Sequence, residues 1–269
     1  MPQFKVAAIQ MNSQPDLDMN MGNVQRLLKE ASEHGANFIG LPENFAFLGD
    51  EPERLKQVKR ISIAVESRLS EWAKEFGVWI LAGGYPVPAD ENKMYNRAAL
   101  ISPGGELTAF YDKIHLFDIT LSDRDSYRES ELVKAGELNP VVYQIPGFMH
   151  VGLSICYDLR FPELYRSLSD RQAQLLCVPS AFTKPTGEAH WEVLLRARAI
   201  ENTAYLLAPA QTGLHGEKRE TYGHSMIIDP WGSILAEAGS EPGIIYAEID
   251  PDKIERIRKK LPSLRHRRL

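Results

Sequence analysis

The chain has 269 residues, of which 43% are hydrophobic and 25% are charged, and its formal net charge is −5. This composition is ordinary for a globular protein, and the small acidic excess argues against a general nucleic-acid binder. Two cysteines, Cys156 and Cys177, cannot form a disulfide framework, so we expect reduced thiols in a cytosolic setting. The N-terminus lacks signal-peptide features and no apolar run reaches membrane-spanning length, so we expect a cytoplasmic protein without membrane partners.

In the first half of the chain, short apolar strands alternate with amphipathic helices. Apolar residues recur at spacings of three and four in both helices, and Gly35 and Gly77 follow as stop signals. The predicted strands lie at 6–10, 37–41 and 78–83, and the helices at 20–34 and 53–76.

A hairpin and a polar stretch follow these elements. The hairpin has arms at 96–102 and 106–111 around a Pro-Gly-Gly turn. Residues 118–130 are polar, and we predict an irregular loop there.

The second half of the chain contains more strands and fewer helices. Strands are predicted at 141–145, 150–155, 175–179, 205–208, 225–228, 233–237 and 244–249. Helices are predicted at 160–171 and 188–202, with a short helix from Asp252.

The hairpins exclude a simple all-parallel sheet and favour an α/β fold with mixed sheets. Many strands are continuously apolar, which is typical of sheets that are buried on both faces. We therefore predict two mixed sheets packed face to face and covered by helices. No Pro- or Gly-rich linker divides the chain, so residues 1–269 are predicted to form a single domain.

The strand at 151–155 ends abruptly at Cys156, where the pattern changes toward a helix. A cysteine at such a corner lies near the positive end of the following helix, which favours the thiolate. A lone cysteine closing an apolar strand is more often a small core residue. Cys156 by itself is therefore predicted to be a core residue. Whether it is a nucleophile instead depends on the residues that other parts of the chain bring near it.

Glu43 and Lys113 also follow predicted strands, and loops at strand ends are where sites form in α/β folds. A carboxylate whose pKa is raised by desolvation can act as the base for a cysteine, and an ammonium can stabilise an oxyanion. The N–H of Tyr157, just after the cysteine, is a natural second donor. Taken alone, Glu43 and Lys113 are more often solvated surface charges, since such residues are mostly exposed.

Three motifs, in order, resemble those of the nitrilase (carbon–nitrogen hydrolase) superfamily. They are Leu41-Pro42-Glu43-Asn44, Tyr111-Asp112-Lys113-Ile114-His115-Leu116-Phe117 and Leu153-Ser154-Ile155-Cys156-Tyr157-Asp158-Leu159-Arg160-Phe161-Pro162-Glu163. The resemblance covers essentially the whole chain. It implies a four-layer α-β-β-α sandwich and a catalytic triad of Glu43, Lys113 and Cys156. It also matches Glu129 to a second glutamate that the family places near the lysine.

Further segments are most similar to the Nit branch of amidases. They are 179–183, 186–191, 195–201, 210–215, 222–224 and 229–232. The resemblance implies hydrolysis of deaminated glutathione to α-ketoglutarate and cysteinylglycine through a thioester. One alternative is an ω-amidase that acts on small amides such as α-ketoglutaramate, and a non-enzymatic alternative is an interaction module with the same fold.

An anionic amide substrate requires polar or cationic anchors. Four residues follow the nucleophile or the next strand end and are our candidates: Tyr157, Arg160, Phe182 and Thr183. For Arg160, an ion pair with Asp158 or Glu163 is an equally good interpretation.

Other chemistries find less support in the sequence. None of the seven histidines has zinc-ligand spacing, so we expect no metal, and nothing suggests a cofactor. A papain-like thiol hydrolase is the mechanistic rival, but its local cysteine motif is missing.

The segment 253–269 is basic, which allows a solvated tail or nucleic-acid contact. The resemblance suggests instead that this tail packs against a partner subunit in a homodimer or larger homo-oligomer.

Overall fold

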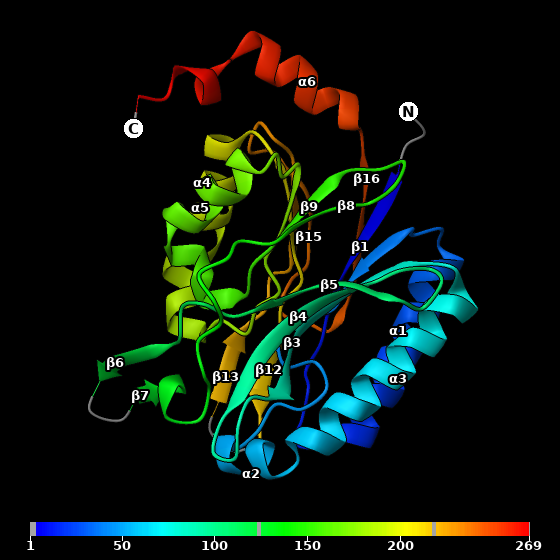
Figure 1. Ribbon diagram of the computed structural model, residues 1–269, viewed down its shortest axis with the longest axis vertical. Coiled ribbons are helices and arrows are strands. Elements are labelled where there is room, and N and C mark those ends of the chain that lie inside the picture. Colours follow the sequence, from blue (N-terminus) through cyan, green and yellow to red (C-terminus); the bar gives the residue numbers. More distant parts are fainter. Residues whose placement is uncertain (1–3, 123–124, 217–218, 269) are drawn as a thin grey trace.

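A computed structural model describes residues 4–122, 125–216 and 219–268. Two six-stranded mixed sheets lie between a pair of helices on one side and a second pair on the other (Figure 1). This arrangement confirms the expected four-layer α-β-β-α sandwich.

The first sheet has the order β16-β1-β2-β3-β4-β5. β1, β2 and β3 run parallel, and the remaining neighbours pair antiparallel. The strands are β1 (Phe4–Gln10), β2 (Phe38–Gly40), β3 (Trp79–Pro88), β4 (Met94–Ile101), β5 (Leu107–Asp112) and β16 (Gly243–Ile249).

The second sheet has the order β15-β14-β11-β10-β9-β8. β9, β10 and β11 run parallel, and the flanking strands pair antiparallel. The strands are β8 (Val142–Gln144), β9 (His150–Leu153), β10 (Leu175–Cys177), β11 (Tyr205–Ala208), β14 (Met226–Ile228) and β15 (Ile234–Glu237).

Alternate residues of one strand face two different layers. In β1, Ala7 and Ile9 pack toward α1 (Leu17–Glu33) and α3 (Val58–Phe76), whereas Val6 and Ala8 belong to the core between the sheets. Since both faces of the strand are buried, its sequence is continuously apolar.

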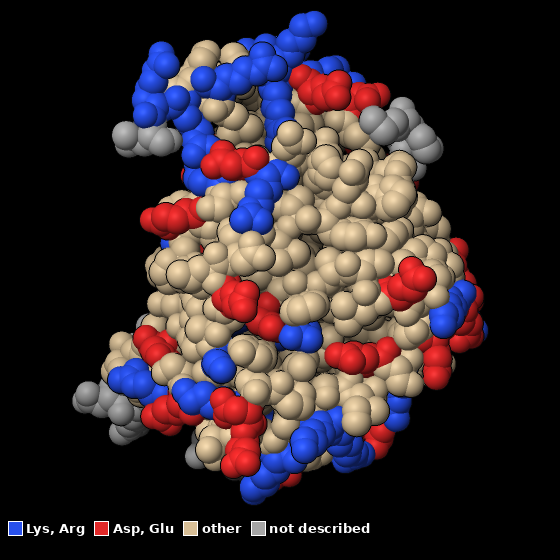
Figure 2. All heavy atoms as spheres, in the orientation of Figure 1, with Lys and Arg blue, Asp and Glu red and all other residues tan. Residues whose placement is uncertain are grey.

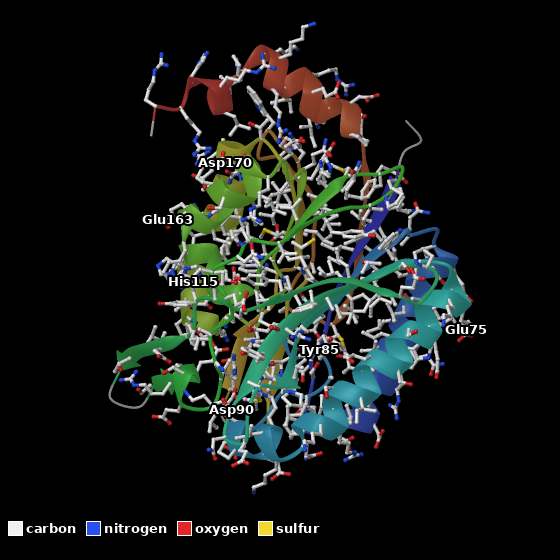
Figure 3. All side chains as sticks on the ribbon, in the orientation of Figure 1. Glu75, Tyr85, Asp90, His115, Glu163 and Asp170 are labelled. Carbon is white, nitrogen blue, oxygen red and sulfur yellow. The ribbon has the colours of Figure 1, made fainter. Side chains whose placement is uncertain are left out.

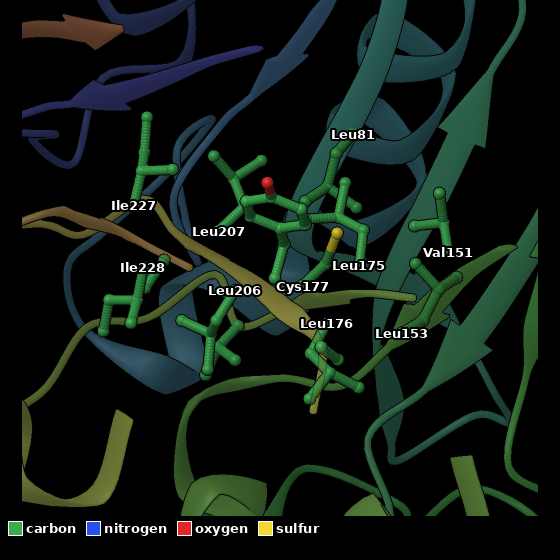
Figure 4. Packing of buried hydrophobic residues seen from close by; sticks show 14 of the residues in the cluster. Leu81, Val151, Leu153, Leu175, Leu176, Cys177, Leu206, Leu207, Ile227 and Ile228 are labelled. Atoms are coloured by element: carbon green, nitrogen blue, oxygen red, sulfur yellow. The ribbon is translucent and has the colours of Figure 1, made fainter. Parts of the chain in front are cut away.

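The core between the sheets also includes Leu81 of β3 with Leu175, Cys177 and Leu207 of the second sheet (Figure 4). The outer face of the second sheet is covered by α4 (Pro162–Asp170) and α5 (Lys184–Asn202), which add Leu168 and Trp191 to the same cluster.

Two local predictions were wrong. The predicted loop 118–130 contains a hairpin of β6 (Asp118–Ser122) and β7 (Asp125–Arg128), followed by the 3-10 turn η1 (Glu129–Glu131). Residues 123 and 124, which the loop included, lie outside the described residues. This hairpin stands apart from both sheets, so its strands lack the apolar face that would identify them in the sequence.

The predicted helix 53–76 is interrupted at Gln57, which separates α2 (Glu51–Lys56) from α3. A further hairpin, β12 (Thr212–His215) with β13 (Arg219–Tyr222), lies beside α2 in the view of Figure 1.

The C-terminal segment consists of α6 (Pro251–Lys260) and η3 (Ser263–His266) and lies at the opposite end of the molecule from α2 (Figure 1). Its Lys and Arg side chains gather on the surface there (Figure 2). Arg267 pairs with Asp170 at the end of α4, which Figure 3 labels. Across residues 4–122, 125–216 and 219–268, no helix is long and apolar enough to cross a membrane.

Candidate active site

Three strand ends from two sheets bring Glu43, Lys113 and Cys156 to one cavity of about 800 Å³. Glu43 follows β2 and Lys113 follows β5, both in the first sheet. Cys156 follows β9 in the second sheet, and Glu129 comes from η1. The facing sheets therefore supply opposite sides of the site.

Glu43 is almost fully buried, with 2% of its surface exposed, and three groups hold its carboxylate. Asn96 Nδ2 and Lys113 Nζ donate to Oε1 over 2.9 and 3.2 Å. The Ala181 N–H donates to Oε2 over 3.0 Å. The Cys156 thiol lies close enough to this carboxylate to influence the pKa of Glu43. The base is thus already aimed at the sulfur.

The glycine pair in β3 makes room for this carboxylate. A Cβ on Gly84 would lie 2.2 Å from Asn96 Oδ1 and 3.0 Å from Glu43 Cγ. Any residue other than glycine would therefore clash with these side chains. The pairing register of β3 and β4 shifts at this point, between Ala82 and Tyr85. The bulge therefore fits β3 around Glu43 and Asn96.

Lys113 is buried between two carboxylates. Besides Glu43, its Nζ donates to both oxygens of Glu129 over 3.1 and 2.8 Å. The Phe117 N–H donates to Glu129 Oε2 over 2.7 Å and so fixes that side chain. Burial alone would lower the pKa of Lys113, but the charges of Glu129 and Glu43 outweigh it and raise that pKa. The ammonium therefore stays charged.

Cys156 opens the 3-10 helix η2 (Cys156–Arg160) in a left-handed backbone conformation, with φ of 49°. A non-glycine residue pays for such a conformation in strain, and functional sites are where such residues concentrate. The Cys156 N–H is bonded to Pro179 O over 3.0 Å. The next N–H, that of Tyr157, lies in the first turn, where a helix supplies no acceptor.

The protonation states differ from the sequence-based expectation. Burial and the Glu43 charge raise the pKa of Cys156 well above its usual value, although Lys113 opposes them. Burial would likewise raise the pKa of Glu43, but the charges of Lys113 and Arg219 and the hydrogen bonds lower it overall. The expected raised carboxyl pKa was wrong, as was the expected thiolate at the helix start. The resting pair is a carboxylate and a thiol.

A buried carboxylate holds the cysteine turn in place. Asp158 is fully buried, and its Oδ2 accepts hydrogen bonds from the Ile155 N–H and the Tyr111 hydroxyl, each over 2.8 Å. Its Oδ1 accepts from the His115 Nδ1–H over 2.7 Å. His115, which Figure 3 labels, is therefore a support for the turn.

The four predicted substrate contacts lie in different places. Tyr157, Phe182 and Thr183 line the cavity. Arg160 is not among the residues that line it; its guanidinium carbon lies 5.8 and 5.4 Å from the ring centroids of Tyr157 and Phe182. Arg160 donates to His190 Nδ1 over 3.3 Å, and no ion pair with Asp158 or Glu163 is found among the described residues.

Several site residues were not singled out from the sequence. Asn96 contacts Glu43, and Ala181 contacts both Glu43 and the sulfur of Cys156. Arg54 and Arg219 line the cavity from α2 and β13. In the sequence these residues look like ordinary strand or surface residues. Their contacts in the folded protein are what place them in the site.

Within the described residues, no three His, Cys, Asp or Glu side chains are grouped so that they could hold an ion. Both cysteines are free, and Cys177 is fully buried in the apolar core.

Comparison with known proteins finds similar sequences over almost the whole chain. A sequence profile described as carbon-nitrogen hydrolase matches residues 5–259. A deaminated glutathione amidase from Synechocystis sp. is 53% identical over 269 residues, which cover 99% of each chain.

Two solved structures extend the comparison. NitFhit from Caenorhabditis elegans, a nitrilase and fragile histidine triad fusion protein, superposes with a TM-score of 0.92 at 39% identity. The match covers 99% of this chain and 65% of the NitFhit chain. An amidase from Nesterenkonia sp. AN1 superposes with a TM-score of 0.82 at 29% identity, covering 96% and 98%. That crystal structure is of a Glu-to-Gln mutant with acrylamide added to the active site cysteine.

Proposed function

The chain belongs to the carbon–nitrogen hydrolase family of the nitrilase superfamily, and from this premise we propose that it is a cysteine-dependent amidase of deaminated glutathione. One observation carries the proposal: Glu43 contacts both Lys113 and the Cys156 thiol inside a single cavity. A volume of about 800 Å³ suits a substrate of tripeptide size.

In the first half of the reaction, the Cys156 sulfur attacks the amide carbon while its proton passes to Glu43. Because the resting thiol is neutral, proton transfer accompanies attack. The Lys113 ammonium and the Tyr157 N–H stabilise the oxyanion. Glu43 then returns the proton to the amine nitrogen of cysteinylglycine as the C–N bond breaks, leaving an α-ketoglutaryl thioester on Cys156.

In the second half, Glu43 takes a proton from water as the water oxygen attacks the thioester carbon. The same two donors stabilise the second oxyanion. When the C–S bond breaks, the proton returns from Glu43 to the sulfur. α-Ketoglutarate leaves, and the carboxylate and thiol of the resting site are restored.

Glu129 acts in this scheme as a positioning residue. Its two contacts with Lys113 balance the charge of the ammonium and aim it at the amide oxygen. Without that second carboxylate, Lys113 would be drawn toward Glu43 alone and away from the oxyanion.

Tyr157, Phe182 and Thr183 contact the substrate in this proposal, because all three line the cavity. Arg160 acts through the rings of Tyr157 and Phe182, over which its guanidinium lies. Its cationic head supports the position of both rings.

The oligomeric state and location belong to the same proposal. We assign the basic C-terminal segment, described over residues 253–268, to the interface of a homo-oligomer, since it lies at one end of the molecule with its Lys and Arg side chains on the surface (Figures 1 and 2). Removing residues 261–269 should lower the mass measured by light scattering from that of an oligomer to that of one chain. Two unpaired, buried cysteines fit a reducing, cytoplasmic location.

The deciding experiment compares the steady-state kinetics of purified protein on deaminated glutathione and on α-ketoglutaramate. A kcat/KM at least ten-fold higher on deaminated glutathione supports the proposal. The reverse preference would identify an ω-amidase, which releases ammonia, and the absence of turnover on any amide would favour an interaction module.

A further inference from the structure

The cavity contains charged groups that the chemistry above does not use. Six buried side-chain N or O atoms lack a hydrogen-bond partner among the described residues, and three of them belong to residues lining this cavity. These three are Glu51 Oε2, Arg54 Nε and Arg219 Nε. Buried polar groups are nearly always bonded, so three at one site need an explanation.

Glu51 lies between the two arginines and is paired closely with Arg54 but only distantly with Arg219. Its Oε2 is 2.5 Å from Arg54 Nη2 without hydrogen-bond geometry, and its Oε1 is 4.0 Å from Arg219 Nη1. Arg54 also donates from Nη1 to Asn44 Oδ1. A carboxylate bound side-on by an arginine normally engages Nε together with one Nη. In both arginines the Nε that such a pair would use has no acceptor.

The other cations of the cavity are already engaged. Among the described lining residues these are Lys113 and Arg128. Lys113 is held by Glu43 and Glu129. Arg128 donates to carbonyl oxygens of its own hairpin, those of Ile119 and Tyr127, over 3.2 and 3.0 Å.

Arg219 lies close to the reacting groups. Its Nη2 donates to Ala181 O over 3.4 Å, and the Ala181 N–H donates to Glu43 Oε2 over 3.0 Å. Its charge is also among the influences that lower the pKa of Glu43. An anion bound by Arg219 would therefore lie a few bonds from the carbon that Cys156 attacks.

We propose that Arg219 and Arg54 form a carboxylate subsite for the 2-oxo acid end of the substrate, and that Glu51 occupies this subsite until the substrate displaces it. This assignment rests on the proposed function, because that function identifies the substrate as deaminated glutathione. The 2-oxo carboxylate is separated from the scissile carbonyl by only three carbons. The glycine carboxylate lies beyond the scissile nitrogen, on the leaving-group side.

Two amides that differ only at this carboxylate test the assignment. Deaminated glutathione is compared with 4-oxopentanoyl-cysteinylglycine, in which a methyl group replaces the 2-oxo carboxylate. The quantity measured is the ratio of kcat/KM for the first substrate to kcat/KM for the second. In Arg219→Gln this ratio should fall at least ten-fold, and Arg219→Lys should restore part of it.

Lys184→Gln is the matched control. Lys184 is exposed and does not line the cavity. It pairs with Glu220, the residue that follows Arg219 in the sequence. Its removal deletes one positive charge and should change the ratio less than two-fold. An equal fall in Arg219→Gln and Lys184→Gln would show a general charge effect and overturn the subsite.

Glu51→Gln tests the displacement and avoids the risk that Arg54 variants fail to fold. Without the competing charge, KM for deaminated glutathione should fall about three-fold or more, with no such fall for the 4-oxopentanoyl compound. An unchanged or higher KM for deaminated glutathione would overturn the role of Glu51. An unchanged ratio in Arg219→Gln would overturn the subsite itself.

A failure of the proposed function gives a different result. If the wild type prefers α-ketoglutaramate to deaminated glutathione, the same variants are measured on α-ketoglutaramate and 4-oxopentanamide. These compounds again differ only by the carboxylate. A fall in their ratio in Arg219→Gln supports the subsite, and a constant ratio overturns it.

Discussion

The Tyr111 hydroxyl donates a hydrogen bond to Asp158 Oδ2 over 2.8 Å, in the space between the two sheets. Tyr111 lies in β5, two residues before Lys113, and Asp158 lies in η2, two residues after Cys156. This one bond therefore joins the strand that delivers the lysine to the turn that delivers the cysteine. It fixes their relative positions across the boundary between the sheets.

Tyr111→Phe should remove this link without changing the shape of the core. Loss of a buried hydrogen bond to a carboxylate costs about 1–3 kcal/mol, so the free energy of unfolding should fall by that amount. The value of kcat should fall as well, because the hydrogen bond that fixes the position of Lys113 relative to Cys156 is lost. Denaturant unfolding and steady-state kinetics measure the two effects. A normal kcat in a destabilised variant would show that the bond serves stability only.

Cys156→Ala should abolish turnover, with a loss of about 10⁴-fold or more in kcat, because Cys156 is the only cysteine among the described residues that line the cavity. Its melting temperature should change little, since alanine and cysteine share the same backbone strain at this position. The control is Cys177→Ala, which leaves a cavity in the apolar core and should lower stability while turnover persists. Retained activity in Cys156→Ala would remove the proposed mechanism.

Glu43→Gln should stop proton transfer in both halves of the reaction. Any thioester that forms should hydrolyse slowly and accumulate, because glutamine cannot activate water. Intact-protein mass spectrometry after mixing with substrate would detect the added acyl group on Cys156. Glu75→Gln, which removes an exposed carboxylate of α3 that does not line the cavity, is the matched control and should turn over normally. Fast turnover in Glu43→Gln would exclude Glu43 as the base.

The two cysteines should differ sharply toward a small thiol reagent such as acrylamide. Cys156 opens into the cavity, and Glu43 can accept its proton during attack. Cys177 is fully buried, has no such base, and has a pKa that burial raises. Peptide mapping should find Cys156 modified at least about a hundred-fold faster in the native protein, with the difference lost in denaturant. Equal native rates would argue against an activated cysteine.

The pH profile follows from the lowered pKa of Glu43. The working form is the carboxylate, so kcat/KM should remain flat from pH 8 down to about pH 5 and fall only as Glu43 becomes protonated, below its ordinary value of 4.5.

The ionised Glu43 side chain should also contribute to the free energy of unfolding, and this contribution should be lost in the same direction of pH. A carboxyl group with a lower pKa in the folded state stabilises it fully above pH 4.5, and this contribution is lost as the pH falls through the folded value. Buffers from pH 4 to 8 in kinetics and thermal melts check both statements. An inflection in kcat/KM between pH 6 and 7 would indicate a raised carboxyl pKa instead.

The sequence by itself determined the layers of this protein and the three residues proposed for catalysis. Continuous apolar strands such as β1 and amphipathic helices such as α1 are local patterns, because burial on one or two faces repeats with the period of the backbone. Glu43, Lys113 and Cys156 could be recognised because each lies within a contiguous motif at a strand end.

Only the tertiary structure decided the electrostatics and the proposed substrate end of the site. The pKa of Glu43 falls because Lys113 and Arg219 converge on it, and no local segment contains that convergence. Arg219 of β13 approaches Glu51 of α2 from a position 168 residues later in the chain. These features depend on distances between residues remote in the chain, so their physical cause appears only once the sheets have packed.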